Sequence, residues 1–229
     1  GRVLIIAGSD SGGGAGIQAD IKTVTALGGY AATAITALTA QNTTGVQAIQ
    51  DVPVEFVNTQ IRSVLTDIGA DIIKTGMLHT TEVIKTVSES LEQYGKDIPL
   101  IVDPVMVAKD GAKLLAYEAV EKLKTLLIKK SFLVTPNIPE AEILADMPIS
   151  TVKDMENAAK KIMLMGPGAV LVKGGHLMSD EITDVLLTKD GFKKFTGKRI
   201  KTNNTHGTGC TLASAIAAHT ANGTDLVLA

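Results

Sequence analysis

A single cysteine, Cys210, directly follows Gly207, Thr208 and Gly209 in the stretch THGTGCTLASAIAAH of this 229-residue chain. The alanine-rich run behind it predicts a helix that begins close to the thiol. The first N–H groups of a helix are unbonded and lie at the positive end of the helix dipole, so they bind phosphate and other oxyanions. Glycine lets the backbone come close to such an anion. We therefore predict an anion site here and expect the same field to lower the pKa of Cys210.

Other interpretations of this segment stay open on the sequence alone. A tight turn followed by a small buried cysteine would give the same letters, because unpaired cysteines are often buried. His206 stands four residues before Cys210. A thiol hydrolase or acyltransferase would need a Cys–His pair, but closeness in sequence is weak evidence for one. The chain has no GxxxxGK[ST] motif, no GxGxxG after its first apolar run and no paired Cys or His spacing for zinc.

The elements that position this segment are predicted by alternating apolar runs and amphipathic stretches. The runs are apolar throughout, which is typical of parallel strands covered on both faces. Alternation of strands and helices predicts right-handed βαβ units, and therefore a mostly parallel central sheet with helices on both faces in a single domain over residues 1–229. The apolar runs are RVLIIAG, ADIIKTG, PLIVDP, SFLVTPN and GAVLVKGG.

Three amphipathic segments, residues 52–69, 80–95 and 151–166, are predicted as helices that end at a glycine C-cap. Residues 180–200 are predicted as an antiparallel pair of strands around an Asp190-Gly191 turn, at one edge of the sheet. In the first helix the apolar stripe consists of Val54, Val57, Ile61, Val64, Leu65 and Ile68.

Composition excludes several classes of function. The chain has 22 Lys and Arg against 24 Asp and Glu, a net charge of −2, and no Trp, so neither nucleic acid nor a membrane is an expected partner. One cysteine forms no internal disulfide, and the first apolar run is too short for a signal peptide or a membrane span, so we expect a cytoplasmic protein. Because the chain lacks an initial Met and stops within TDLVLA, we expect that one or both ends are trimmed.

Polar or glycine residues follow nearly every predicted strand. In parallel α/β sheets, ligands bind outside the carboxyl ends of the strands, so these residues predict a catalytic rim. They are Gly8-Ser9-Asp10, Lys74-Thr75-Gly76-Met77, Asp103-Pro104-Val105-Met106, Thr135-Pro136-Asn137 and Lys173-Gly174-Gly175-His176.

Three charged or polar positions on this rim have two interpretations each. Asn137 and Glu140 form an N-x-x-E motif that suits Mg²⁺ bound through water, or else the N-cap and capping-box partner of a helix. Asp103 could serve metal and phosphate, or only bond the turn that follows it. Lys173 could pair with nucleotide phosphates, or only extend its charged end from a strand toward water.

Six motifs in the same order give the chain a family resemblance from residue 3 to about residue 221. The chain resembles the ribokinase-like superfamily, and within it the hydroxymethylpyrimidine and phosphomethylpyrimidine kinases of thiamine biosynthesis. The resemblance implies a three-layer ribokinase-like α/β fold. It also implies transfer of the γ-phosphoryl group of ATP to a hydroxymethyl oxygen, and then to the resulting monophosphate. The motifs are AGSDSGGGAGIQADIKT, KTGML, VDPVM, TPNIPEAE, VKGGH and THGTGCTLASAIA.

The resemblance also implies roles for individual residues. The N–H groups of Gly207, Thr208 and Gly209 would hold the transferring phosphoryl group, and Cys210 would act as general base toward the substrate hydroxyl. Sugar-kinase relatives usually have Asp at the position of Cys210. ATP would be bound by Lys173, Asp103, Thr135 and Asn137, and Mg²⁺ by Glu140 and Asp103 through water.

On the substrate side, Gln41 offers one acceptor and two donors, which suits the ring nitrogen and amino group of an aminopyrimidine. A turn-capping amide is the alternative role of Gln41, which we place just past the second buried strand. Met77 and Val105 would form apolar walls, although Met77 could equally belong to the core. Asp20 and Gly8 would shape the pocket around the first turn.

Two rival functions remain. A pyridoxine or pyridoxal kinase of the same fold can also carry Cys after the glycines, but Gln41 favours the pyrimidine. A catalytically inactive nucleotide-binding or regulatory protein would be expected to lose Cys210, Lys173 or Glu140, and all three are present. The resemblance implies a homodimer.

Overall fold

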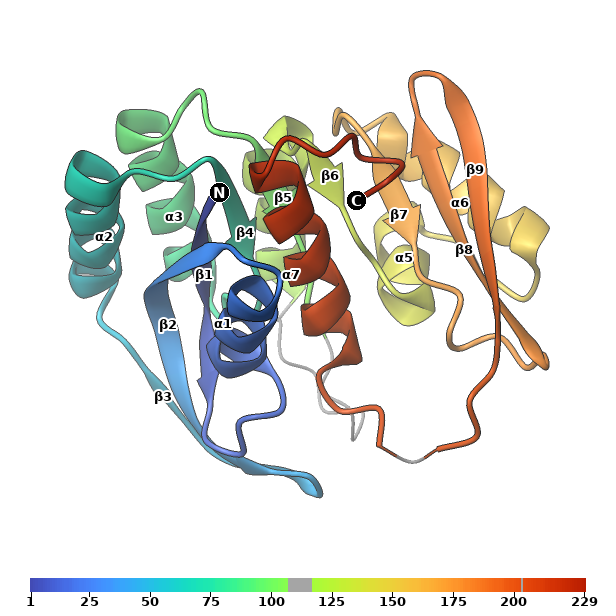
Figure 1. Ribbon diagram of the computed structural model, residues 1–229, viewed down its shortest axis with the longest axis horizontal. Helices are drawn as coiled ribbons and strands as arrows, with labels where there is room; N and C mark the ends of the chain where they lie inside the picture. Colours follow the sequence, from blue (N-terminus) through green and yellow to red (C-terminus); the bar gives the residue numbers. More distant parts are fainter. Residues whose placement is uncertain (107–116, 203) are drawn as a thin grey trace.

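The computed structural model describes residues 1–106, 117–202 and 204–229 (Figure 1). The described strands all belong to one mixed sheet in the order β3-β2-β1-β4-β5-β6-β7-β8-β9. They are β1 Arg2–Asp10, β2 Tyr30–Asn42, β3 Gly45–Asp51, β4 Ile72–Thr75, β5 Leu100–Val102, β6 Leu133–Val134, β7 Val170–Val172, β8 Glu181–Thr188 and β9 Gly191–Lys198.

Helices separate most of the strands along the chain, as the alternating pattern predicts. Short turns of π- or 3₁₀-helix cover Val64–Ile68, Leu123–Leu127 and Ile128–Lys130. The α-helices are α1 Gly16–Ala26, α2 Val54–Ser63, α3 Thr81–Tyr94, α4 Tyr117–Lys122, α5 Ile138–Ala145, α6 Val152–Met163 and α7 Thr208–Ala221.

The centre of the sheet is parallel and both of its edges are antiparallel. Strands β2, β1, β4, β5, β6 and β7 pair in parallel, while β8 and β9 form the predicted antiparallel pair beyond β7. The second antiparallel edge, β3 against β2, is missing from the sequence-based prediction. That prediction also places Gln41 past the second strand, which is wrong, because β2 continues through Asn42 and includes Gln41.

Helices cover both faces of the sheet, as predicted (Figure 1). Alternate side chains of β1 point to opposite faces, so Leu4 and Ile6 pack with α2, α3 and the other helices on one side, whereas Val3 and Ile5 pack with α1 and α7 on the other. Continuous apolar strands are therefore required, because each face of the sheet has its own core. Within the described part of the chain, no helix has both the length and the apolar character needed to cross a bilayer.

The predicted glycine ends hold for two of the three helices. The helical stretch that starts as α2 stops at Gly69, whose φ of 72° is left-handed, and α3 is followed by Gly95. The third prediction is wrong in position, since α6 ends at Met163 with Leu164 as its C-cap, and Gly166 lies further along. The spacing of apolar residues therefore predicts the buried face of a helix more reliably than its last residue.

The apolar stripe of α2 gives a direct test of this packing. Ile61 is fully buried, whereas Phe56 on the same helix is 58% exposed. We expect Ile61→Ala to lower the free energy of unfolding by about 2–5 kcal/mol, because it leaves a cavity in the core. The control Phe56→Ala should stay within about 0.5 kcal/mol of the parent in urea unfolding. Equal losses in the two variants would mean that α2 packs through a different face.

Candidate active site

Three side chains from neighbouring strand ends meet in a buried cluster. Lys173, which follows β7, places its Nζ 2.9 Å from Oδ1 of Asp103, which follows β5. Thr135, after β6, donates its hydroxyl to the same oxygen over 3.0 Å. Burial alone would raise the pKa of Asp103, but the charges of Lys173 and Lys74 outweigh it and lower that pKa. Parallel pairing of the three strands thus brings together the rim residues that the sequence predicts.

Asn137 and Glu140 add the start of α5 to this cluster. Asn137 accepts from the Glu140 N–H at 3.0 Å and Glu140 accepts from the Asn137 N–H at 2.8 Å, which confirms the capping box. A parallel bridge between Asn137 and Lys173 holds the helix start beside β7. Burial raises the pKa of Glu140 to about 7; Lys173 opposes this shift and Asp103 adds to it.

The carboxylates of this cluster fit a magnesium ion only in part. Asp103 and Glu140 supply the hard oxygen ligands that Mg²⁺ prefers, and both are almost fully buried. Among the described residues, no three His, Cys, Asp or Glu side chains come close enough together to hold a metal. Two carboxylates suit an ion that keeps most of its water and takes further oxygens from a phosphate group.

The start of α7 lies against the same cluster. Gly207 is the N-cap residue, with a left-handed φ of 79°, and α7 begins at Thr208 as the sequence predicts. A Cβ added at Gly209 would lie 3.2 Å from Nζ of Lys173. The start of the helix and the Lys173 ammonium group therefore face one region, which suits an anion. The Thr208 N–H donates weakly to the Thr205 carbonyl oxygen over 3.4 Å. The anion itself remains a prediction.

The expected low pKa of Cys210 is wrong for this structure. Desolvation of the half-buried thiol raises its pKa to about 11. Asp103 and Asp20 raise it further, while Lys74 and the Gly16 N–H oppose the shift. The helix dipole, on which the expectation rested, is too small to offset the loss of water and the two nearby carboxylates.

Alkylation tests this thiol directly, because the chain has one cysteine. With a pKa near 11, the rate of reaction with iodoacetamide should rise about tenfold per pH unit from pH 7 to pH 10, since only the thiolate reacts. In the same chain unfolded in urea, the alkylation rate should level off just above pH 8.5, because the pKa of a free cysteine is about 8.5. Mass spectrometry gives both rates, and a plateau near pH 8 in the folded protein would contradict the raised pKa.

A fully buried ion pair lies beneath α7. Nζ of Lys74 on β4 is 2.9 Å from Oδ1 of Asp20 on α1, and neither side chain is exposed. Ser214 of α7 donates to the same carboxylate over 2.7 Å. Burial works against the charge of Lys74, but Asp20, Cys210 and Asp103 raise its pKa. Lys74 lies on the predicted rim but has no predicted role, although a lysine inside the apolar run ADIIKTG indicates a buried, paired cation.

Asp20 has no exposed surface, and its carboxylate is bonded to Lys74 and Ser214. A part of Asp20 in shaping the substrate pocket stays a prediction.

Removing one partner of this pair should be costly. We expect Lys74→Met to lower the free energy of unfolding by about 3–5 kcal/mol, because it leaves the Asp20 charge buried and unpaired. The double variant Lys74→Met/Asp20→Asn removes both charges and should recover a large part of that loss. Urea unfolding at pH 7 compares the two variants. A double variant that is less stable than Lys74→Met would contradict the argument.

The predicted substrate-side residues lie around the end of β1. A Cβ at Gly8 would come within 2.6 Å of Cε of Met77, so the two are in direct contact. Thr36 holds the Met77 segment by donating to its carbonyl oxygen over 2.8 Å. Val105 and Gln41 are half-buried, and Gln41 accepts a hydrogen bond from Thr39 over 3.1 Å. Whether these residues contact a substrate stays a prediction.

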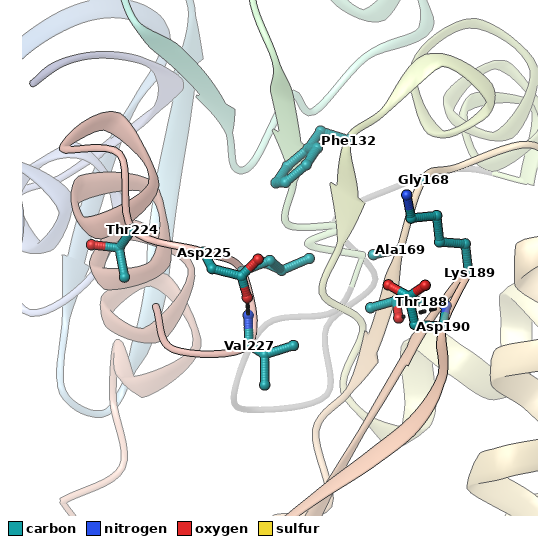
Figure 2. A pocket seen from close by; sticks show the side chains of 10 residues that line it. Phe132, Gly168, Ala169, Thr188, Lys189, Asp190, Thr224, Asp225 and Val227 are labelled. Atoms are coloured by element: carbon teal, nitrogen blue, oxygen red, sulfur yellow. Dashed lines mark hydrogen bonds between the residues drawn. The ribbon is translucent and has the colours of Figure 1, made fainter.

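A separate hollow lies at the opposite edge of the sheet (Figure 2). It opens beside the residues that precede β6 and β7, the β8–β9 turn and the segment after α7. The residues of the rim lie at or just after the carboxyl ends of their strands, so this hollow is not the predicted site. It is lined by Phe132, Gly168, Ala169, Thr188, Lys189, Asp190, Thr224, Asp225, Leu226 and Val227.

The chain is similar to known proteins over nearly its whole length. The family model described as phosphomethylpyrimidine kinase matches residues 10–229. The chain belongs to the phosphomethylpyrimidine kinase family. Hydroxymethylpyrimidine/phosphomethylpyrimidine kinase of Bacillus subtilis is 49% identical over 97% of this chain and 82% of that protein. The thiamine biosynthesis bifunctional protein ThiED of Geobacter sulfurreducens is 51% identical, and the chain covers 99% of its own length but 46% of that protein.

Solved structures in and near the family share the fold. Phosphomethylpyrimidine kinase from Clostridium difficile superposes with a TM-score of 0.88 at 43% identity, over 99% of this chain and 93% of that one. Pyridoxal kinase from Staphylococcus aureus in complex with ADP gives a TM-score of 0.91 at 37% identity, over 99% and 82%. Likeness of fold therefore extends to pyridoxal kinases, and the predicted ribokinase-like architecture is confirmed.

Proposed function

We propose that this chain transfers the γ-phosphoryl group of ATP to 4-amino-5-hydroxymethyl-2-methylpyrimidine, and then to its monophosphate, in thiamine biosynthesis. The observation that carries the proposal is the meeting of the α7 N-terminus with the Lys173–Asp103–Glu140 cluster at one edge of the sheet. Phosphoryl transfer needs positioning and charge stabilisation more than covalent chemistry, and this edge offers both. Membership of the family and the names of the relatives supply the substrate class.

The phosphate side of the proposed site combines backbone and lysine contacts. The N–H groups of Gly207, Thr208 and Gly209 stabilise the transferring phosphoryl group, and Lys173 contacts the phosphates of ATP. Lys173 donates to Asp103, and Thr135 donates to the same carboxylate oxygen. Asn137 would lie beside them on the nucleotide side. A relative bound to ADP supports a nucleotide in this fold.

We propose that Glu140 and Asp103 hold Mg²⁺ through water when ATP is bound. The ion would neutralise phosphate charge during transfer. The chain itself contributes two fixed carboxylates, one of them anchored by the capping box of α5.

On the substrate side, we propose that Gln41 binds the ring nitrogen and amino group of the pyrimidine. Met77 and Val105 cover the faces of the ring, and Gly8 allows the Met77 side chain to pack directly on β1. Thr39 accounts for one lone pair of the Gln41 carbonyl oxygen, which leaves the amide N–H groups to donate to the ring.

Cys210 is proposed as the base that receives the proton of the attacking hydroxyl group. With a pKa near 11, about one thiol in ten thousand is ionised at pH 7. In a loose transition state the attacking oxygen loses its proton late, so a scarce but strong base remains compatible with turnover. The rate of the chemical step should then rise with pH.

We further propose that the chain acts as a single domain, as a cytoplasmic homodimer, with no nucleic acid or membrane partner. The molar mass measured by light scattering after size-exclusion chromatography tests the dimer.

The first experiment measures ADP release from Mg-ATP with hydroxymethylpyrimidine, with its monophosphate and with pyridoxal, followed by product masses. We expect pyrimidine monophosphate and diphosphate. A product from pyridoxal alone would leave the proposed site in place but assign the chain to vitamin-B6 phosphorylation. The structural likeness to pyridoxal kinases supports this alternative. No ADP release with any of the three would contradict kinase activity.

Two variants test the base. We expect Cys210→Ala to lower the chemical step by about 10²-fold or more, within the range for loss of a general base. Cys210→Asp places a stronger acid at the same position, so it should retain more activity than the alanine variant and lose the rise of kcat between pH 7 and pH 10. Stopped-flow or quench measurements of a single turnover give the rates. Near-normal turnover in Cys210→Ala would contradict the proposal that Cys210 is the general base.

A further inference from the structure

Asp10 and His206 join two loops that are 196 residues apart in sequence. Asp10 ends β1, and its carboxylate accepts the N–H groups of Gly12 at 2.8 Å, Gly14 at 3.0 Å and Ala15 at 2.8 Å, which fixes the β1–α1 loop. The same carboxylate receives Nε2 of His206 at 2.8 Å. His206 immediately precedes Gly207, the N-cap of α7. One buried side chain therefore fixes the β1–α1 loop and the start of the last helix together.

Steric contacts show how closely the two loops fit. A Cβ at Gly14 would lie 2.5 Å from Cδ2 of His206, and a Cβ at Gly207 would collide with the carbonyl oxygen of Gly14. Glycine at both positions is what allows the loops to touch through their backbones. Asp10 is 2% exposed. Although burial opposes its charge, His206 and the three loop N–H groups lower the pKa of Asp10.

This contact connects the two halves of the proposed site. The β1–α1 loop follows Gly8, which touches Met77 on the substrate side. The loop also leads to Gly16, whose N–H faces the Cys210 thiol. Beyond the contact, α7 presents its N–H groups toward Lys173. A small shift of one loop against the other would change the distance between the substrate hydroxyl, the thiol and the phosphate.

We propose that Asp10 and His206 are positioning residues of the phosphoryl transfer, whose hydrogen bond fixes the start of α7 and Cys210 against the β1–α1 loop. This inference rests on the proposed function of that helix start. The bond requires a proton on Nε2, which the imidazolium ion and one neutral tautomer both carry, so the link does not depend on a charged histidine. A misplacement of about 1 Å at a reacting group costs up to about 10²-fold in rate.

The test compares two replacements of His206 with a matched control. Gln can place its amide nitrogen where Nε2 lies and donate to Asp10, whereas Leu cannot donate. His219, in the last turn of the same helix, is half-buried, and His219→Leu controls for the change of side chain. We expect His206→Leu to lower kcat by about tenfold or more, with the KM for ATP changed less than about threefold. His206→Gln and His219→Leu should stay within about threefold of the parent.

A second readout is independent of catalysis. Because the Cys210 thiol faces the Gly16 N–H across this junction, His206→Leu should raise the rate of iodoacetamide alkylation at pH 8 by about threefold or more. Asp10→Ala, which removes the oxygen that accepts from His206, should give the same changes in both readouts and tests the link where the leucine variant folds poorly.

The outcomes separate the two proposals. If the parent chain phosphorylates none of the substrates, the proposed function fails, while the alkylation rates still test the link. Unchanged kcat and unchanged alkylation in His206→Leu would overturn the inference. Equal impairment of the Gln and Leu variants would also overturn it, because it would show that the bond to Asp10 is not what matters.

Discussion

Lys74 and Asp20 place opposite charges together where neither side chain reaches water. Taking two charges out of water costs several kcal/mol, which their attraction regains only with close geometry and further hydrogen bonds. Here Ser214 supplies the further bond, so the pair ties together α1, β4 and α7. The pair places a fixed cation on the inner side of α7. The charge of Lys74 lowers the pKa of Asp103 and opposes the rise in the pKa of Cys210.

The charges of the rim are nearly balanced before any ligand arrives. Lys74 and Lys173 face Asp20 and Asp103, and Glu140, with a pKa near 7, carries only about half a charge at neutral pH. Each lysine is already within 3 Å of a carboxylate oxygen. Both lysines are therefore already paired before a phosphate binds, unlike a lysine on an open loop. Rigid pairing of this kind holds side chains in place before the substrate binds, which is what a reaction dependent on positioning requires.

The sequence predicts the parallel sheet, the helices on both faces and the residues of the rim, because these follow from local periodicity and from the carboxyl-end rule for strands. It also predicts the capping box of Asn137 and Glu140, which is a local pattern. The pKa of Cys210 could not be predicted, because a helix start is visible in sequence but desolvation and the carboxylates of Asp103 and Asp20 are not. The bond between Asp10 and His206 joins residues 196 positions apart, and spacing patterns in a sequence predict only local structure.

The paired state of Lys173 explains the glycines at the start of α7. Because Asp103 already pairs with Lys173, this lysine alone cannot neutralise an incoming phosphate, and further groups must contribute. The chain offers backbone N–H groups, which carry partial positive charge, need no counter-ion and are available at full strength only where no Cβ stands in the way. Gly207 additionally needs its left-handed backbone to let α7 begin against Gly14. Under the proposed function the glycines therefore serve twice: they leave backbone N–H groups open to the phosphate, and they allow the contact of α7 with the first loop.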